Sequence, residues 1–160
     1  MGNLYEIEGT LKNKVMMDID SVINEIFRDY FGVSVIADGK ARLENPKGGC
    51  LCQVNMQQEG MDMLLCFNFD SDLLHHLVDG AYGGDSSQNS DSYKDAACEI
   101  ANIVCCRVKS VLNEHGYSLS MDLPYSVEKD GKNINYKDSI NMYFSVNDGS
   151  GFFVDLFTSK

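Results

Sequence analysis

A glutamate and an asparagine three residues apart, Glu99 and Asn102, stand in the mostly apolar segment KDAACEIANIVCCRVKSVLNEHG, residues 94–116. At about 100° per residue around a helix axis, the apolar side chains collect into one stripe that we expect to face the core. That stripe consists of Ala97, Ile100, Ala101, Val104, Val108, Val111 and Leu112. The opposite face consists of Asp95, Glu99, Asn102, Cys106, Lys109 and Asn113, with Ile103 at its edge. Glu99 and Asn102 are therefore predicted to point outward together, one turn apart.

Both residues have an ordinary explanation, because every solvated helix face needs polar side chains and glutamate is a good helix former. Asparagine in the middle of a helix is less expected, since its amide competes with the backbone and costs a few tenths of a kcal/mol relative to alanine. The pair is a candidate functional site, with plain surface residues as the alternative.

The chemistry open to this pair is positioning rather than covalent catalysis. Neither side chain is a good nucleophile here, and no histidine lies within one helical turn to activate one. An exposed carboxylate is ionised at neutral pH and can attract a lysine of a partner, while a carboxamide can hold a water in a fixed orientation. Such a pair suits a helix that enters another protein's pocket and aligns a water for attack.

The composition limits the classes of function. The chain has 160 residues, 44% hydrophobic, with a net charge of −11, which is typical of one globular domain. Nucleic acid and anionic membrane surfaces are disfavoured as partners, because no Lys/Arg cluster is present. No stretch approaches the ~20 apolar residues of a membrane span, and the first ten residues do not resemble a secretion signal. We expect a cytoplasmic protein with a single domain over 1–160, in which 1–14 is irregular or a short strand.

Six cysteines, at positions 50, 52, 66, 98, 105 and 106, are expected to be reduced fillers of the core and surface. The close pairs Cys50–Cys52 and Cys105–Cys106 lack the C-x-x-C spacing of zinc and thioredoxin-like sites. The sequence therefore predicts no metal site and no disulfide.

Helices and hairpins alternate along the chain. The 3–4 spacing of apolar residues from Ile19 to Tyr30 predicts a helix over 18–32 that ends at Gly32. Apolar runs predict a short strand after Gly32, hairpins over 48–69 and 140–157, and a strand over 117–124 that ends at Pro124. The remaining predicted elements are a helix over 72–82 capped by Asp70 or Ser71, a surface loop over 83–92 and the helix 94–116. This order predicts an α+β fold in which an antiparallel or mixed sheet packs with two to three helices.

The segment EIAN, the helix that continues to NEHG and the following strand that ends in DLP together resemble the Glu-x-x-Asn region of the CheX branch of the CheC/CheX/FliY chemotaxis phosphatases. The hairpin GGCLCQVNMQQEGMDMLLCFNF, the helix that ends LVDGAYGGD and the closing strands follow in that family's order. The resemblance covers nearly the whole chain. A single Glu-x-x-Asn motif is similar to CheX rather than to the two-motif CheC arrangement.

The resemblance implies a phosphatase that removes the phosphoryl group from the aspartate of a phosphorylated CheY-type receiver. It implies that Glu99 pairs with the receiver's active-site lysine and that Asn102 orients the attacking water. It also implies that Mg²⁺ is supplied by the receiver, that this chain binds no cofactor, and that the protein is a homodimer. We expect Asp95, Ile103, Cys106 and Lys109, around the pair, to contact the partner.

The chain departs from the family at two positions on this helix. The family often has a small residue, typically glycine, just before the glutamate and seven residues after it, where this chain has Cys98 and Cys106. Cys106 shares the outward face, so its sulfur can crowd a docking receiver or pack against it. The alternatives are therefore a non-catalytic CheX-like module that binds a receiver or a flagellar-switch protein, and a dimeric structural domain.

Overall fold

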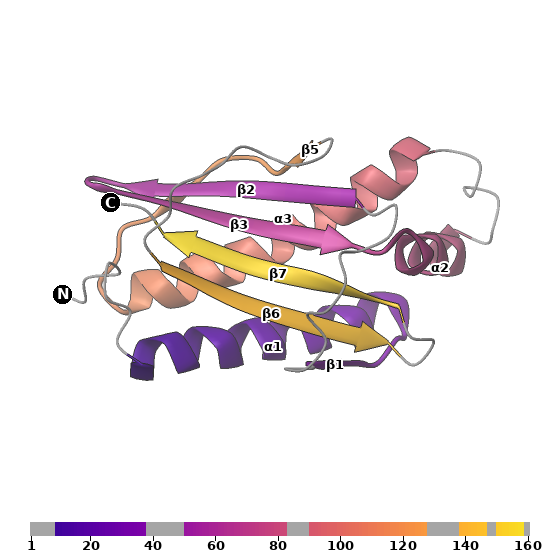
Figure 1. The fold of residues 1–160 in the computed structure, drawn as a ribbon, viewed down its shortest axis with the longest axis horizontal. Coiled ribbons are helices and arrows are strands. Elements are labelled where there is room, and N and C mark those ends of the chain that lie inside the picture. Colours follow the sequence, from indigo (N-terminus) through magenta and orange to yellow (C-terminus); the bar gives the residue numbers. More distant parts are fainter. Residues whose placement is uncertain (1–8, 38–49, 83–89, 128–137, 147–149, 159–160) are drawn as a thin grey trace.

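The residues that the structure describes form one seven-stranded sheet and three helices (Figure 1). The computed structural model describes residues 9–37, 50–82, 90–127, 138–146 and 150–158. In chain order the elements are α1 (Gly9–Phe31), β1 (Val35–Ala37), β2 (Cys50–Gln58), β3 (Met61–Phe69), α2 (Ser71–Tyr82), α3 (Ser90–Glu114), β4 (Ser120–Met121), β5 (Tyr125–Val127), β6 (Asp138–Val146) and β7 (Gly151–Thr158).

The sheet has the strand order β1-β6-β7-β3-β2-β4, and β5 also pairs with β2. Every pairing is antiparallel. The predicted α+β fold is confirmed, and so are the hairpins β2–β3 and β6–β7. The tip of the second hairpin, 147–149, lies outside the described residues.

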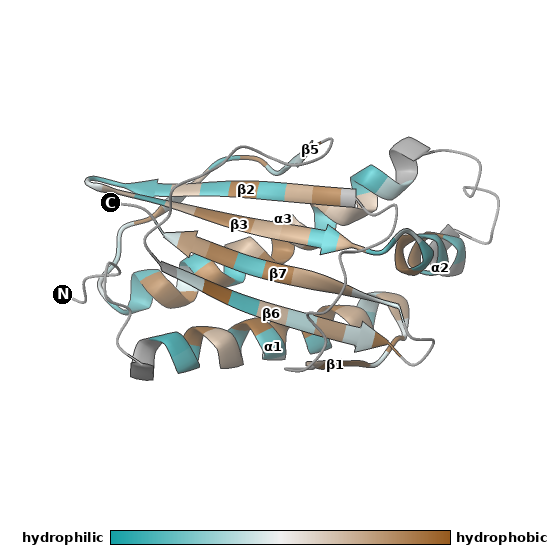
Figure 2. Cartoon of the chain, viewed as in Figure 1, coloured by the Kyte–Doolittle hydropathy of each residue, from teal (hydrophilic) through white to brown (hydrophobic). Residues whose placement is uncertain are grey.

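Helices α1 and α3 lie side by side across one face of the sheet, and α2 lies beyond the end of β3 (Figure 1). Hydrophobic residues run along much of β3 and β7, the central strands, while β2 alternates (Figure 2). Alternation is typical of a strand with one buried face. On β2 the residues that face the helices are Cys52, Val54 and Met56, all fully buried.

Stacked phenylalanines join α1 to three strands. The ring centroid of Phe152 on β7 lies 5.1 Å from each of the ring centroids of Phe27 on α1, Phe69 on β3 and Phe144 on β6. Aromatic pairs at this separation contribute about 0.5–1.5 kcal/mol beyond the burial of their area. The cluster holds α1 against the sheet, and α3 packs beside it.

Helix α1 is longer than predicted and begins at Gly9, so the prediction of an irregular segment or strand is wrong for 9–14. Residues 1–8 lie outside the described part. The apolar stripe extends back to Val15, which is buried, and this extra turn could have been found from its spacing to Ile19. Tyr30, placed in the stripe by periodicity, is 67% exposed. Gly32, with φ of 66°, ends the helix as predicted.

Two further boundaries differ from prediction. Helix α3 begins at Ser90, so 90–92 is helical rather than loop, and 83–89 lies outside the described residues. The predicted strand 117–124 is reduced to β4, and β5 follows directly after Pro124. Both short strands pair with β2, and proline interrupts a ladder because it has no N–H to donate. One edge strand is therefore split in two.

The start of β7 is fixed to the end of β3. Asp70 accepts a hydrogen bond from the Gly151 N–H at 2.9 Å and donates its own N–H to the Gly151 carbonyl at 3.0 Å. The Asp70 carbonyl also accepts the first bond of α2 from Leu74, at 3.2 Å, which places Asp70 at the predicted cap position.

We expect Gly151→Ala to destabilise the protein, because a Cβ there would overlap the Phe144 carbonyl oxygen and the Tyr143 hydroxyl. Overpacking of this kind costs about 1–3 kcal/mol, measurable as a lower free energy of unfolding in urea. Gly32→Ala, where the added Cβ meets open space, is the comparison, with a cost of about 1–2 kcal/mol from the left-handed backbone alone. A Gly151→Ala midpoint equal to that of the unchanged protein would contradict this packing.

Within the described ranges, none of the helices has the length and apolar character that a membrane span requires.

Candidate functional site

Helix α3 is held by its predicted apolar stripe. One member, Val111, is half-buried, and the others are buried. The buried members are Ala97, Ile100, Ala101, Val104, Val108 and Leu112. The helix packs on β2 and against α1, and Arg107 reaches Glu25 of α1 at 4.0 Å. That ion pair is exposed and contributes little to stability. The apolar contacts are what make α3 a rigid support.

Glu99 is exposed and Asn102 is half-buried. Three residues apart, the two side chains leave the helix about 60° from each other. No hydrogen bond or ion pair joins either side chain to the described residues. The predicted pair therefore lies at the surface, with Glu99 pointing outward and Asn102 at the border between the outward face and the packed flank.

The flank below Asn102 is formed by Cys98, one turn earlier on the helix. Cys98 is half-buried, packs against the core, and has its sulfur 2.9 Å from the sulfur of Cys52 on β2. Asn102 therefore lies on the side of α3 that is turned toward β2, while Arg107 lies on the side turned toward α1.

The four residues expected to contact a partner fall into three environments. Asp95 and Cys106 are exposed, and Lys109 is half-buried. Ile103 is half-buried and packs against the core, so part of its side chain already contacts its own chain. Asp95, Cys106 and Lys109 therefore form one surface with Glu99 and Asn102, which we call the α3 outer face.

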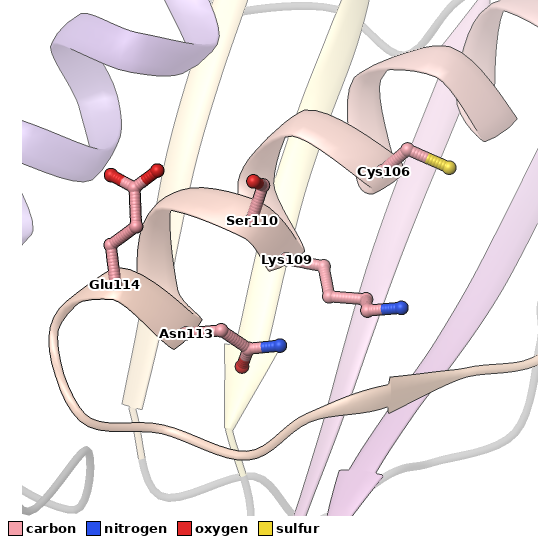
Figure 3. Close-up of a pocket in the computed structure, with 5 residues that line it drawn as sticks. All are labelled: Cys106, Lys109, Ser110, Asn113 and Glu114. Atoms are coloured by element: carbon pink, nitrogen blue, oxygen red, sulfur yellow. The ribbon is translucent and has the colours of Figure 1, made fainter.

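A hollow of about 510 Å³ lies along the second half of α3 (Figure 3). Figure 3 shows Lys109 and Asn113 pointing to one side of the helix and Glu114 to the other. The residues that line this hollow are Cys106, Lys109, Ser110, Asn113 and Glu114. Ser110 and Glu114 were not predicted to belong to a site, because at about 100° per residue both lie beside the outward face of the helix rather than on it.

Asn113 has a structural role at the end of the helix. Its side-chain oxygen accepts the Leu119 N–H at 2.8 Å, and its side-chain nitrogen donates to the Leu119 carbonyl at 3.3 Å. Gly116, with φ of 99°, completes the turn at the predicted stop. Asn113 therefore fixes the segment that leads into β4 and is bound within its own chain.

The family model described as chemotaxis phosphatase CheX matches residues 50–145, more than half of the chain. The chain belongs to the CheX family. The match extends from the start of β2 to the penultimate residue of β6 and includes all of α3 with Glu99 and Asn102. The predicted family is confirmed.

Solved structures show the same CheX/CheC-like fold. Chemotaxis protein CheX from Vibrio vulnificus aligns with a TM-score of 0.75 and 16% identity over 92% of this chain and 98% of that one. A CheC-like superfamily protein from Shewanella sp. PV-4 aligns at 0.72 and 16% identity over 99% and 100%. A CheX–CheY–BeF3–Mg²⁺ complex from Borrelia burgdorferi aligns at 0.73 and 16% identity over 93% and 98%. No curated protein matches the chain.

Proposed function

We propose that this protein dephosphorylates the aspartyl phosphate of a CheY-type receiver domain. The observation that carries the proposal is the exposed Glu99 beside the accessible Asn102 on a rigid helix of a CheX-family chain. The family's description as a chemotaxis phosphatase supports the activity, and a structural relative in complex with CheY supports the partner.

Glu99 anchors the receiver in this proposal. Its carboxylate is exposed and has no partner among the described residues, so it is available for the lysine of a receiver's active site. A charge-assisted hydrogen bond is about twice as strong as a neutral one. Glu99 therefore contributes mainly to docking affinity.

Asn102 positions the water. Its carboxamide accepts one hydrogen bond from the attacking water and donates another to a neighbouring oxygen, which fixes the direction of the water's lone pair. The water attacks phosphorus, the bond from phosphorus to the aspartate oxygen breaks, and the products are the free carboxylate and inorganic phosphate. The gain comes from orientation rather than from a covalent intermediate.

Mg²⁺ belongs to the receiver in this scheme, and the chain itself binds no cofactor. The resemblance implies this division, in which the acyl phosphate and the metal arrive together on the partner. The chain then supplies only the two side chains of α3.

The second candidate function is a CheX-like module that binds a receiver or a flagellar-switch protein without hydrolysis. The exposed thiol of Cys106 on the α3 outer face favours it, because it adds bulk where the family often has glycine. Phosphate release from an acetyl-phosphate-labelled receiver, followed with Mg²⁺ present, separates the two. Acceleration over the receiver's own rate supports the phosphatase, and tight binding at an unchanged rate supports the module. The absence of receiver binding refutes the phosphatase and a module that binds a receiver.

We also propose a homodimer, which the resemblance to CheX supports. Light scattering coupled to size-exclusion chromatography should report twice the 17.8 kDa mass of the chain. A monomer across the micromolar range would contradict this proposal and would leave the roles of Glu99 and Asn102 unchanged.

A further inference from the structure

Two cysteines from different elements meet beneath the α3 outer face. The sulfurs of Cys52 on β2 and Cys98 on α3 are 2.9 Å apart, although the residues are 46 positions apart in the chain. Apolar heavy atoms count as in contact at about 4 Å, and a disulfide bond is about 2.05 Å long. Neither cysteine takes part in a disulfide here, and the two sulfurs are closer than ordinary packing contact and within a small movement of bonding.

The two thiols differ in their access to solvent. Cys52 is fully buried, while Cys98 is half-buried at the border of α3. A small reagent in solution therefore reaches Cys98 first, and Cys52 is reached through Cys98. This is the arrangement of an attacked thiol with a resolving thiol next to it.

Two other buried cysteines are poor competitors. Burial, with the nearby charge of Asp155, raises the pKa of the Cys66 thiol to about 12. Burial also raises the pKa of the Cys105 thiol well above its ordinary value. Because the thiolate is the reactive form, neither competes with Cys98 for a reagent in solution. Cys52 is buried too, and what distinguishes it is the Cys98 sulfur at 2.9 Å. Cys106 is exposed and can react with a reagent in solution, so it needs a control.

We propose that Cys52 and Cys98 form a reversible disulfide that ties α3 to β2 and lowers the activity of the α3 outer face. The oxidant is a low-molecular-weight disulfide. Cys98 attacks it, forms a mixed disulfide and releases one small thiol; Cys52 then attacks the Cys98 sulfur and releases the second. Two protein thiols are oxidised, one small disulfide is reduced to two thiols, and the protons pass to the leaving sulfurs.

The effect on function follows from position and rests on the proposed function. Cys98 precedes Glu99 directly and lies one turn before Asn102, so a bond at Cys98 acts on the turn that carries both. Closing the sulfurs from 2.9 Å to a bond length of about 2.05 Å draws that turn toward β2. A misplacement of about 1 Å can cost on the order of 100-fold in rate, so we expect a loss of roughly 10-fold or more.

Peptide mapping tests the bond without reference to activity. The folded protein is incubated with oxidised glutathione, free thiols are blocked, and the digest is run without reductant. We expect a Cys52–Cys98 linked peptide lighter by two hydrogen atoms than the separate peptides, and its loss after dithiothreitol. Cys98→Ser and Cys52→Ala should each abolish it, and Cys106→Ser and Cys50→Ser should retain it. Mixed disulfides at Cys98 and Cys106 without a Cys52–Cys98 link would overturn the proposal.

The second measurement addresses regulation. The oxidised protein should dephosphorylate the receiver roughly 10-fold more slowly than the reduced protein, and dithiothreitol should restore the rate. Cys98→Ser should keep one rate under both conditions. Cys106→Ser, whatever its own basal rate, should show the same ratio of oxidised to reduced rate as the unchanged protein. Equal rates for the linked and reduced forms would overturn the regulatory step. If the reduced protein does not accelerate hydrolysis, the proposed phosphatase fails; receiver affinity then replaces the rate as the readout, and peptide mapping still decides the bond.

Discussion

Asn102→Ala should reduce receiver dephosphorylation to the receiver's own rate while the receiver still binds. The methyl group of alanine can neither accept nor donate a hydrogen bond, so nothing orients the water in the docked complex. Removing one such positioned polar group typically costs about 10²–10³-fold in kcat. The measurement is single-turnover phosphate release at saturating protein, together with receiver affinity from titration.

Two further variants keep this result interpretable. Asn102→Asp has nearly the same shape but lacks the amide donor and adds a charge near a phosphoryl group, so it should also lose the rate. Ser110→Ala, on an exposed position of the same helix, should keep it. Because Asn102 is half-buried rather than part of the core, we expect these variants to unfold at nearly the same urea concentration as the unchanged protein. A full-rate Asn102→Ala protein would remove the mechanism.

Glu99→Ala should act mainly on affinity. Loss of a hydrogen bond between charged groups costs about 1.5–3 kcal/mol, which is roughly 10- to 100-fold in Kd. At saturating protein the rate should stay near that of the unchanged protein, because Asn102 is still in place. Receiver titration by fluorescence or calorimetry, followed by phosphate release at saturation, separates the effect on affinity from the effect on rate.

Glu114→Ala is the matched control for Glu99→Ala, since Glu114 is also an exposed glutamate of α3 but lies near its end. It should leave Kd unchanged. The difference between Glu99→Ala and the unchanged protein should also shrink as salt is added, because exposed ion pairs are screened. A Glu99→Ala protein that binds normally but loses the rate would show that Glu99 belongs to the chemistry rather than to docking.

The parts of the fold that periodicity controls could be predicted from the sequence. The stripe from Ala97 to Leu112 identified the buried side of α3, and Gly116 marked its end, because both signals are local. The hairpin β2–β3 was likewise predictable from two apolar runs and the turn at Gly60. In each case neighbouring residues determine the structure.

The parts that depend on distant contacts could not be predicted. The angular positions of residues around a helix separate its buried side from its exposed side, but they do not say which strand lies under which flank. Asn102 was therefore predicted to point outward, whereas it is half-buried. The contact between Cys52 and Cys98 depends on α3 crossing β2, which no spacing of cysteines encodes. Strand β5 begins after Pro124, a residue that indicated an end rather than an interruption.

The structure of this protein in complex with a BeF3-treated receiver and Mg²⁺ tests the proposal most directly. We predict that the receiver docks on the α3 outer face, with the Asn102 carboxamide inside its active site and the Glu99 carboxylate within about 4 Å of its lysine. A receiver bound to another surface, or to α3 with Asn102 outside the site, would contradict the proposed mechanism.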